Sequence, residues 1–550
     1  MIIPRVKQYR ETEGNISFGE EIRVWFAGET AQRLAFAARE LLYPVQITEA
    51  DSAEGADLIL RCGYDSVGTG IRLPDAGAAE NSLWMQKGDY RITCKERCVI
   101  VTAAEFAGGR NALATLSQLL QVEKGYVTMP KVDIADAPDA SFRSFMHDVV
   151  RKFIPLEELK MHLLLMAKCK MNVLHFHFTE YVGFAIAFSA FPELKGPACT
   201  GGRQYTEAQI LELVEYAAAL GIEVIPEIDL PGHANAITDA YPALRCQPQD
   251  GRASHGWALC VGNEQMYEFL ECLIAETVKL FPSPYFHIGT DEITMGDVIR
   301  TPRPLADWLD CTVCQALARK EQLENDTQLF YYFLRRVYAI LKKLGKRMIM
   351  WNDQIDISVS PDLPRDILIE FWRVAAPTRG PVEGCSMQRF LEEGFSVINA
   401  NFPDTYIDLY VEYDRLKSWD YRRNPASDAE TAGVILGGDV CAWDVFAHFA
   451  HTVPVSIACF ADRFWNRKPI TEEQVFRIGL TELLLGEADF DFFDYTKDVI
   501  VLDNENRIFR EDIGREALCE RLADQPGDNP VEQYMKQVYR QLLSCRTTGL

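Results

Sequence analysis

The chain has 550 residues, of which 48% are hydrophobic and 25% charged, a composition typical of a globular protein with more than one domain. Its formal net charge of -24 and its pI near 4.9 argue against a nucleic-acid partner, because binding a polyphosphate requires clustered lysine and arginine. No apolar run approaches the ~18 residues of a membrane span, and the opening MIIPRVKQYRETEG lacks the basic flank and long apolar region of a signal peptide. We therefore expect a cytoplasmic protein without a membrane partner.

Residues 1–140 predict a small α+β domain. Strand-like and helix-like runs alternate in it, at 57–62, 89–94 and 98–104 for the strands and at 30–42 and 109–120 for the helices. The stretch KVDIADAPDAS at 131–141 carries proline and aspartate, and we expect it to join this domain to the next.

Residues 141–470 repeat a unit in which an apolar strand is followed by a polar loop, an amphipathic helix and often a glycine. Eight strand-like runs occur, at 141–149, 172–178, 223–230, 285–292, 347–353, 366–372, 395–402 and 433–443. Several are continuous apolar runs, as expected of parallel strands that are covered by helices. Eight such units predict a closed (β/α)8 barrel, and an open doubly wound sheet is the alternative.

Local signals mark helix ends in this region. Gly221, Gly345 and Gly394 each separate a helix-like run from a strand-like run, and glycine closes a helix readily because it adopts the left-handed conformation. The helix-like run that ends at Gly221 begins with Thr206 and Gln209 in the arrangement of a capping box. The remaining residues, 471–550, read as a mostly helical extension without a catalytic motif.

The chain contains 15 cysteines, many of them in apolar segments, which favours buried thiols over disulfides. The one Cys-x-x-Cys pair, Cys311 and Cys314, has no second pair and no histidine at zinc spacing. We therefore expect no metal site there.

A metal-dependent hydrolase is one alternative for the barrel, because His175 and His177 on a strand-like run face the same side. A catalytic zinc site needs at least three protein ligands, and only His233 and His287 stand near other strand ends. We expect neither a metal nor a cofactor.

Aromatic residues gather where the barrel strands should end. Trp351, Trp372 and Trp443 stand at the ends of the fifth, sixth and eighth strand-like runs, and the strand ends of a barrel surround one pocket. An indole at a pocket rim loses apolar burial unless a ligand covers it, and a pyranose ring offers a face of C–H groups. Carbohydrate is therefore the predicted substrate class.

The run at 285–292 ends in two adjacent carboxylates, Asp291 and Glu292. Cleavage of a glycosidic bond needs an acid for the leaving oxygen and an anionic or nucleophilic group at the anomeric carbon. Adjacent side chains at a strand end diverge, whereas a retaining pair must flank the sugar about 5 Å apart. The pair favours a 2-acetamido sugar that attacks its own C1 through the acetamide oxygen, with the protein supplying one acid and one carboxylate for the acetamide N–H.

Four segments in order, SFRSFMHDVVR, KCKMNVLHFHFTE, EVIPEIDLPGH and HIGTDE, resemble glycoside hydrolase family 20, the β-N-acetylhexosaminidases. The N-terminal domain, which ends in GRNALATLSQLL, is similar to the domain that precedes the barrel in that family. The resemblance implies a (β/α)8 barrel and a retaining, exo-acting, substrate-assisted hydrolysis of terminal β-linked N-acetylglucosamine or N-acetylgalactosamine. It also implies a small oligosaccharide or aminosugar glycoside as substrate and no cofactor, and it leaves a homodimer open.

The resemblance further implies roles for single residues. Glu292 matches the general acid/base, and Asp291 matches the carboxylate that orients and stabilises the acetamide. Arg143 matches the arginine that grips the sugar hydroxyls, for which a planar fork of donors suits vicinal oxygens. The other implied binding residues are a histidine with its supporting carboxylates, His233, Asp229 and Glu180, the aromatic walls Trp351, Trp372 and Trp443, and the acetamide and hydroxyl partners Tyr406 and Asp408.

The chain departs from the family pattern at the rim of the site. Thr290 stands where the family commonly has glycine, and residues 181–185 replace the usual Asp-Gln-Gly-Trp-Arg. The acid expected two residues after Trp443 is replaced by Val445, and Asp444 is displaced by one position, which can turn it away from the pocket. We expect both epimers at the sugar 4-hydroxyl to be accepted. A barrel that binds sugars without cleaving them is the other alternative, although it leaves the adjacent carboxylates unexplained.

Overall fold

The computed structural model describes residues 1–63, 82–293, 307–353, 355, 363–372, 386–402, 404–407, 416–424, 427–430, 434–443, 449–471, 483, 499–502 and 508–511. Two expected binding residues, Asp408 and Asp444, lie outside these residues, as does most of the expected helical extension at 471–550. The two described segments of four residues in that extension are strands β23 (Val499–Leu502) and β24 (Ile508–Glu511), which pair antiparallel.

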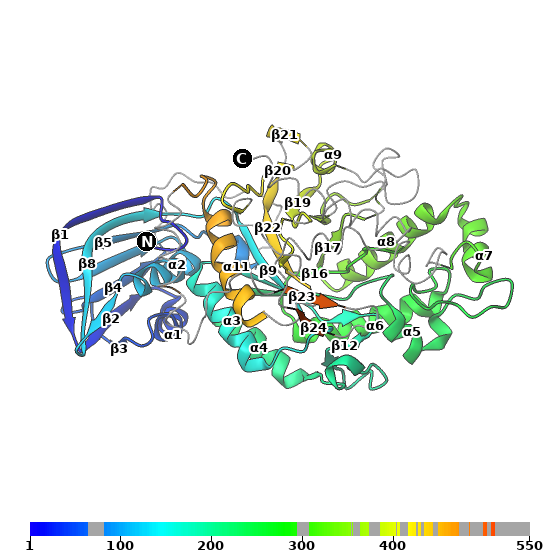
Figure 1. The fold of residues 1–550 in the computed structure, drawn as a ribbon, viewed down its shortest axis with the longest axis horizontal. Helices are drawn as coiled ribbons and strands as arrows, with labels where there is room; N and C mark the ends of the chain where they lie inside the picture. The colour runs from blue at the N-terminus through cyan, green and yellow to red at the C-terminus, as the bar shows by residue number, and fades with distance from the viewer. Residues whose placement is uncertain are drawn as a thin grey trace.

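The N-terminal part is a mixed sheet with two helices on one side. Its strands are β1 (Gln8–Gly19), β2 (Glu21–Ala27), β3 (Gln46–Glu49), β4 (Leu58–Cys62), β5 (Tyr90–Cys94), β6 (Val99–Ala103), β7 (Gln121–Glu123) and β8 (Tyr126–Asp136), in the order β1-β8-β5-β6-β4-β2-β3 with β7 beside β8. The helices α1 (Ala31–Leu41) and α2 (Phe106–Ser117) lie between this sheet and the barrel, against helix α3 (Leu156–Lys168) (Figure 1).

Buried polar contacts join the sheet to the barrel. The ammonium group of Lys170 lies 3.1 Å from the carboxylate of Asp136 at the end of β8, and both side chains are fully buried. The indole N–H of Trp465 donates to the other oxygen of Asp136, 2.9 Å away. A buried charge requires such partners, so these contacts fix how the two parts meet.

The second part is a closed barrel of eight parallel strands, which confirms the predicted fold and excludes the open sheet. In chain order the strands are β9 (Phe142–Asp148), β10 (Val173–His177), β15 (Glu223–Glu227), β16 (Tyr285–His287), β17 (Arg347–Trp351), β18 (Leu368–Phe371), β19 (Ser396–Asn399) and β22 (Ile435–Ala442). Each strand pairs in parallel with its neighbour, and β22 closes the barrel on β9.

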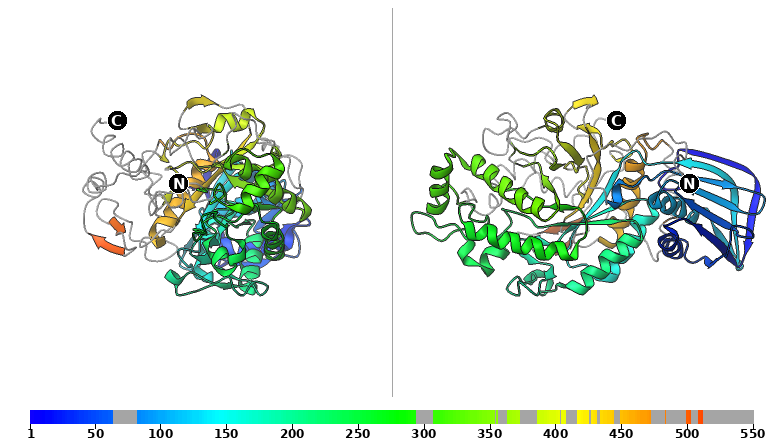
Figure 2. Two further views of the ribbon diagram at one scale, coloured as in Figure 1. Left: turned by 90° about the vertical axis from the view of Figure 1, so that its right-hand side faces the viewer. Right: turned by 180° about the vertical axis from the view of Figure 1, so that it is seen from behind.

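Helices surround the barrel, as the two further views show (Figure 2). They are α3, α4 (Glu207–Ala219), α6 (Glu264–Leu280), α8 (Asp326–Lys343), α9 (Met387–Glu392) and α11 (Phe449–Trp465), whereas the short α5 (Asn235–Ala240) and α7 (Thr312–Glu321) lie in the loops. The expected capping box opens α4, and Gly221, Gly345 and Gly394 have φ values of 72°, 72° and 88°, as predicted for helix ends. Among the described residues, no helix combines the length and apolar character that crossing a bilayer requires.

Candidate active site

Aromatic side chains form one wall at the carboxyl ends of the barrel strands. Trp351, which ends β17, has its ring centroid 5.9 Å from that of Trp443, which follows β22. Tyr406 lies 6.1 Å from Trp443 and stacks at 6.1 Å on Trp372, which follows β18. The structure thus brings together the three tryptophans that were expected to form the walls of a sugar site and Tyr406, which was expected to bind the acetamide.

The two adjacent carboxylates lie beside His233. One oxygen of Asp291 and one of Glu292 are each 3.7 Å from His233 Nε2, and these three atoms lie within 4.8 Å of one another. On its other side, His233 Nδ1 is 3.0 Å from the carboxylate of Glu180. Asp291 is largely buried, whereas the Glu292 side chain is 37% exposed.

The pair converges because it does not belong to a strand. Strand β16 ends at His287, and the backbone then turns through left-handed residues, with φ of 66° at Gly289, 94° at Thr290 and 48° at Glu292. Side chains in such a turn need not alternate as they do along a strand. A φ of 94° at Thr290 is unusual for a β-branched residue and strains the backbone one residue before the carboxylates.

Gly289 leaves room for a carboxylate. A Cβ atom built on Gly289 would lie 1.9 Å from Asp229 Oδ1 and 2.6 Å from Asp229 Cα. We expect Gly289→Ala to displace Asp229, to lower the free energy of unfolding by more than about 2 kcal/mol and to abolish activity. Gly345→Ala is the control, because Gly345 has a similar φ of 72° but open space around it. Equal losses in the two variants would show that only the backbone conformation matters.

Asp229 and Asp291 share a hydrogen bond in the interior. Burial, and then the nearby Asp291 carboxylate, raise the pKa of Asp229 well above its usual value. The backbone N–H of Thr290 donates to Asp229 Oδ1, 3.1 Å away. One oxygen of the second carboxylate, Asp291 Oδ1, is buried and accepts no hydrogen bond from any described residue. A buried acceptor without a donor is costly, and it suits a ligand N–H.

One residue links the wall to the carboxylates. Asp353, two residues after β17, accepts a hydrogen bond from the indole N–H of Trp372. Its other oxygen lies 3.5 Å from the backbone nitrogen of Glu292, which donates to it. The indole N–H of Trp443 is buried and has no hydrogen-bond acceptor among the described residues. Donor and acceptor groups therefore face the same site beside an apolar wall.

Beneath the wall, Glu227 is the centre of a buried network. Its carboxylate lies 2.9 Å from His175 Nε2 and 3.1 Å from His287 Nδ1, and it also bonds to His177. The indole N–H of Trp351 donates to it, 2.9 Å away. Burial alone would lower the pKa of His177, but Glu227 reverses this and raises it to about 10. The two histidines that suggested a metal-dependent hydrolase thus share a carboxylate inside the barrel and help to fix Trp351.

His233 predicts a stability loss at alkaline pH. Burial would lower its pKa, but Glu180, Asp291 and Glu292 raise it from 6.5 to about 9. The stabilisation is therefore complete below about pH 6.5 and is lost as the pH rises through about 9. We expect the Tm to fall over that range, and to fall less steeply in His233→Gln when both are followed by thermal denaturation.

His162 provides the control for this measurement. Burial lowers its pKa to about 4, so its ring is neutral throughout the alkaline range. His162→Gln should shift the Tm without changing its slope against pH. A slope that is unchanged in His233→Gln would contradict the assignment of the alkaline transition to His233.

Arg143 does not lie where the resemblance put it. It is the second residue of β9, at the amino end of the barrel, and its guanidinium donates to the carbonyls of Ala140, Ser141 and Lys170. The substrate site lies at the opposite end, because β9 reaches it only at Asp148. The expected contact between Arg143 and the sugar is therefore corrected: this side chain ties together the chain segments that enter β9 and β10.

Two residues at the site were missed from the sequence. Arg151 follows β9, bonds to Asp148 and Glu180, and places its guanidinium carbon 5.7 Å from the ring centroid of Trp443. Trp257 packs on His233 with ring centroids 4.4 Å apart and donates to the backbone oxygen of Glu292, 3.3 Å away. Arg151 could have been found, because it stands just past the carboxyl end of the first strand. Trp257 lies in a long loop whose sequence carries no such signal.

Comparison with known proteins agrees with this geometry. Residues 141–468 match the family described as Glycosyl hydrolase family 20, catalytic domain, and residues 1–137 match Glycosyl hydrolase family 20, domain 2. A β-hexosaminidase of Porphyromonas gingivalis is 30% identical over 380 residues, which cover 66% of this chain and 46% of that protein. A β-hexosaminidase of Vibrio furnissii is 29% identical over 354 residues, 60% of this chain and 54% of that protein. The chain thus spans about half the length of these relatives.

Solved structures share the fold. The Flavobacterium johnsoniae chitobiase superimposes with a TM-score of 0.70 at 27% identity, covering 88% of this chain and 72% of that one. The Vibrio harveyi exo-β-N-acetylglucosaminidase in complex with N-acetylglucosamine gives a TM-score of 0.71 at 21% identity, covering 88% and 76%. With the family match extending over most of the described barrel, the chain belongs to glycosyl hydrolase family 20.

Proposed function

We propose that the protein is a retaining exo-β-N-acetylhexosaminidase that removes terminal β-linked N-acetylglucosamine and N-acetylgalactosamine by substrate-assisted catalysis. The observation that carries the proposal is Asp291 Oδ1, a buried acceptor without a donor among the described residues, placed next to the more exposed Glu292. An acetamide N–H supplies the missing donor, and the neighbouring aromatic wall suits a sugar face. Family membership and the β-hexosaminidase relatives support the same activity.

The proposed first step breaks the glycosidic bond without a protein nucleophile. The acetamide carbonyl oxygen forms a bond to C1 as the C1–O bond to the leaving group breaks, and Glu292 gives its proton to the departing oxygen. Asp291 accepts the acetamide N–H and stabilises the positive charge that spreads over the cyclised ring. Both carboxylates lie on the His233 side within 4.8 Å of each other, an arrangement that does not place one on each face of the sugar.

The proposed second step restores the acetamide. Water attacks C1, Glu292 accepts the proton that the water loses, and the bond between C1 and the acetamide oxygen breaks. Two inversions at C1 give net retention of configuration. The His233 cation balances the negative charge of the carboxylates beside it.

In this proposal Arg151, and not Arg143, binds the sugar hydroxyls. Its guanidinium borders the wall at Trp443, where a planar fork of donors can reach sugar hydroxyls. We expect Arg151→Lys to raise KM about tenfold or more, because lysine keeps the charge but not the fork. Arg143→Lys is the matched variant and should lower Tm with little change in KM. A raised KM in Arg143→Lys together with an unchanged KM in Arg151→Lys would instead show that Arg143 binds the hydroxyls.

Turnover of 4-nitrophenyl β-N-acetylglucosaminide and of its galactosaminide tests the proposed activity. We expect hydrolysis of both, with kcat/KM values within about tenfold of each other, a gap of about 1.4 kcal/mol. Release of the β-anomer, followed by NMR, should show retention. Binding of the sugars without hydrolysis would favour the binding barrel instead. We also propose a cytoplasmic location, which the absence of disulfides among the 12 described cysteines supports and which cell fractionation tests.

A further inference from the structure

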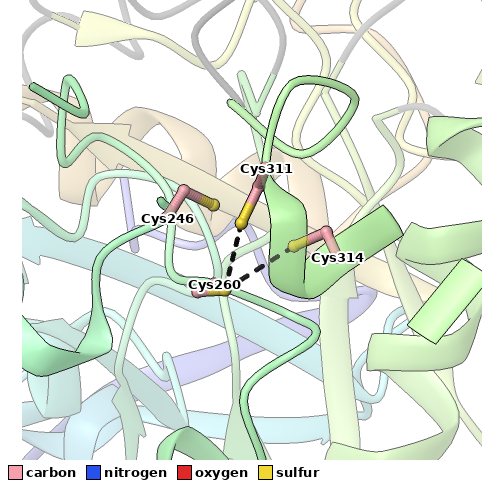
Figure 3. A group of neighbouring side chains, drawn as sticks. All are labelled: Cys246, Cys260, Cys311 and Cys314. Carbon is pink, nitrogen blue, oxygen red and sulfur yellow. Dashed lines mark hydrogen bonds between the residues drawn. The ribbon is translucent and has the colours of Figure 1, made fainter. Parts of the chain in front are cut away.

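Four cysteines from separate parts of the chain converge in one place. Cys246 and Cys260 lie in the loop between β15 and α6, Cys311 caps the start of α7, and Cys314 lies in its first turn. All four are buried, and their sulfur atoms lie within 4.8 Å of one another. Figure 3 shows the four sulfur atoms turned toward a common centre. The expectation that the Cys-x-x-Cys pair has no partners is therefore wrong.

The spacing of the sulfur atoms matches a single tetrahedral ion. Cys260 Sγ is 3.7 Å from Cys311 Sγ and 3.6 Å from Cys314 Sγ (Figure 3). In a tetrahedral site with Zn–S bonds of about 2.3 Å, two sulfur atoms are separated by about 3.8 Å. In an iron–sulfur cluster the four thiolates are divided between two or four iron atoms, and thiolates on different irons must stand further apart than the 4.8 Å within which all four lie here, so this spacing favours one ion.

A disulfide does not account for the group. The S–S bond is about 2.0 Å long, and Cys260 is nearly equidistant from two other sulfur atoms, so no pair is singled out. Ordinary packing of thiols does not require four of them to meet either, because a free cysteine packs as a small apolar side chain beside any other. The convergence of four ligand atoms is the feature that a metal ion explains.

The backbone around the cysteines is built to bring two loops together. Pro248 forms an isolated antiparallel bridge with Cys311, and the backbone N–H of Gln247 donates to the sulfur of Cys311, 3.2 Å away. An N–H bond to sulfur stabilises the thiolate, which is the form that binds metal. A Cβ atom on Gly262 would lie 2.7 Å from the backbone of Cys314, so only glycine permits this approach.

We propose that Cys246, Cys260, Cys311 and Cys314 bind one Zn²⁺ ion at a structural site separate from the substrate site. Four protein ligands close a tetrahedral zinc, so the ion has no open position for catalysis. When Zn²⁺ binds, the four thiols lose their protons and the thiolates fill the coordination sphere of the ion, which stabilises the folded loops. The assignment is independent of the proposed glycosidase activity.

The site would hold a substrate-contacting loop in place. Trp257 lies between Cys246 and Cys260 in the chain, and it both packs on His233 and donates to the backbone of Glu292. The ion ties this loop to the start of α7, which follows the catalytic pair in the chain. Zinc loss is therefore expected to lower Tm and to disturb the position of Trp257, without removing any catalytic group.

Metal content tests the proposal. We would purify the full chain under reducing conditions, without a chelator or a metal-affinity step, and measure metals by mass spectrometry. We expect about one zinc per chain, and almost none in the Cys311→Ser/Cys314→Ser double variant. Cys169→Ser and Cys272→Ser, one buried and one exposed cysteine of other elements, are controls that should keep the zinc. A parent protein with no more zinc than the double variant would overturn the proposal.

A second measurement needs no substitution, in case the double variant fails to fold. X-ray absorption at the zinc edge of the parent should give four sulfur neighbours at about 2.3 Å. Nitrogen or oxygen neighbours would instead place the ion among the histidines and carboxylates of the barrel and contradict the cysteine site. An intact mass that reveals a disulfide among these cysteines would do the same. Activity on the nitrophenyl sugars is recorded separately, so failure of the zinc site leaves the proposed function untouched.

Discussion

Replacing Glu292 by glutamine should lower kcat on 4-nitrophenyl β-N-acetylglucosaminide by at least ~10²-fold, the contribution expected of a general acid. Glutamine keeps the size of the side chain and its place beside His233 but cannot give a proton to the leaving oxygen. The loss should be larger for a disaccharide substrate than for the nitrophenyl sugar, because an alkoxide leaves poorly without protonation. Steady-state kinetics on the two substrates measures both effects.

Glu215→Gln is the control for this variant, because Glu215 is an exposed carboxylate on α4, away from the barrel mouth. It should hydrolyse both substrates at the parental rate. The Glu292 variant should melt only slightly below the parent, since the Glu292 side chain is 37% exposed and water screens its attraction to His233, 3.7 Å away. A Glu292 variant as fast as the parent would remove Glu292 from the acid role.

The second large effect is expected at Asp291. Asp291→Asn keeps the volume but withdraws the charge that stabilises the cyclised intermediate, an interaction that strengthens toward the transition state. It also replaces one acceptor oxygen with an N–H₂ group, which is only a donor. In one of the two orientations of the Asn amide, this group would face the acetamide N–H and could not accept its hydrogen bond. We expect kcat to fall by about 10²-fold or more and to change more than KM. A thiazoline analogue of the intermediate should bind the parent tightly and the variant much more weakly.

Substrate structure provides the matched control for Asp291. A 4-nitrophenyl β-glucoside, which lacks the 2-acetamido group, should be nearly inert with the parent, because the protein supplies no nucleophile of its own. The Asp291→Asn substitution should therefore change its slow hydrolysis little. Efficient cleavage of the glucoside by the parent would instead indicate a protein nucleophile and contradict the substrate-assisted mechanism.

Local sequence was sufficient for most of the fold and for the centre of the site. Continuous apolar runs predicted the parallel strands, and glycines such as Gly221 marked helix ends, because both signals act within a few residues of the chain. The pair Asp291 and Glu292 stood out for a similar reason, since two adjacent acids at the end of an apolar run have no ordinary role in a core.

Tertiary structure alone decided which distant residues meet and at which end of the barrel they lie. Arg143 and Arg151 are both close to the first strand in sequence, yet a strand of seven residues carries them to opposite ends of the barrel. Gly289 must lack a side chain because Asp229, just past the end of another strand, lies against it, and local propensity does not register this contact. The four cysteines illustrate the limit most clearly, because Cys246 and Cys314 are far apart in the chain and become neighbours only when two loops pack together. Short-range patterns determine the elements, whereas a site made of loop residues depends on packing between elements, which no single segment encodes.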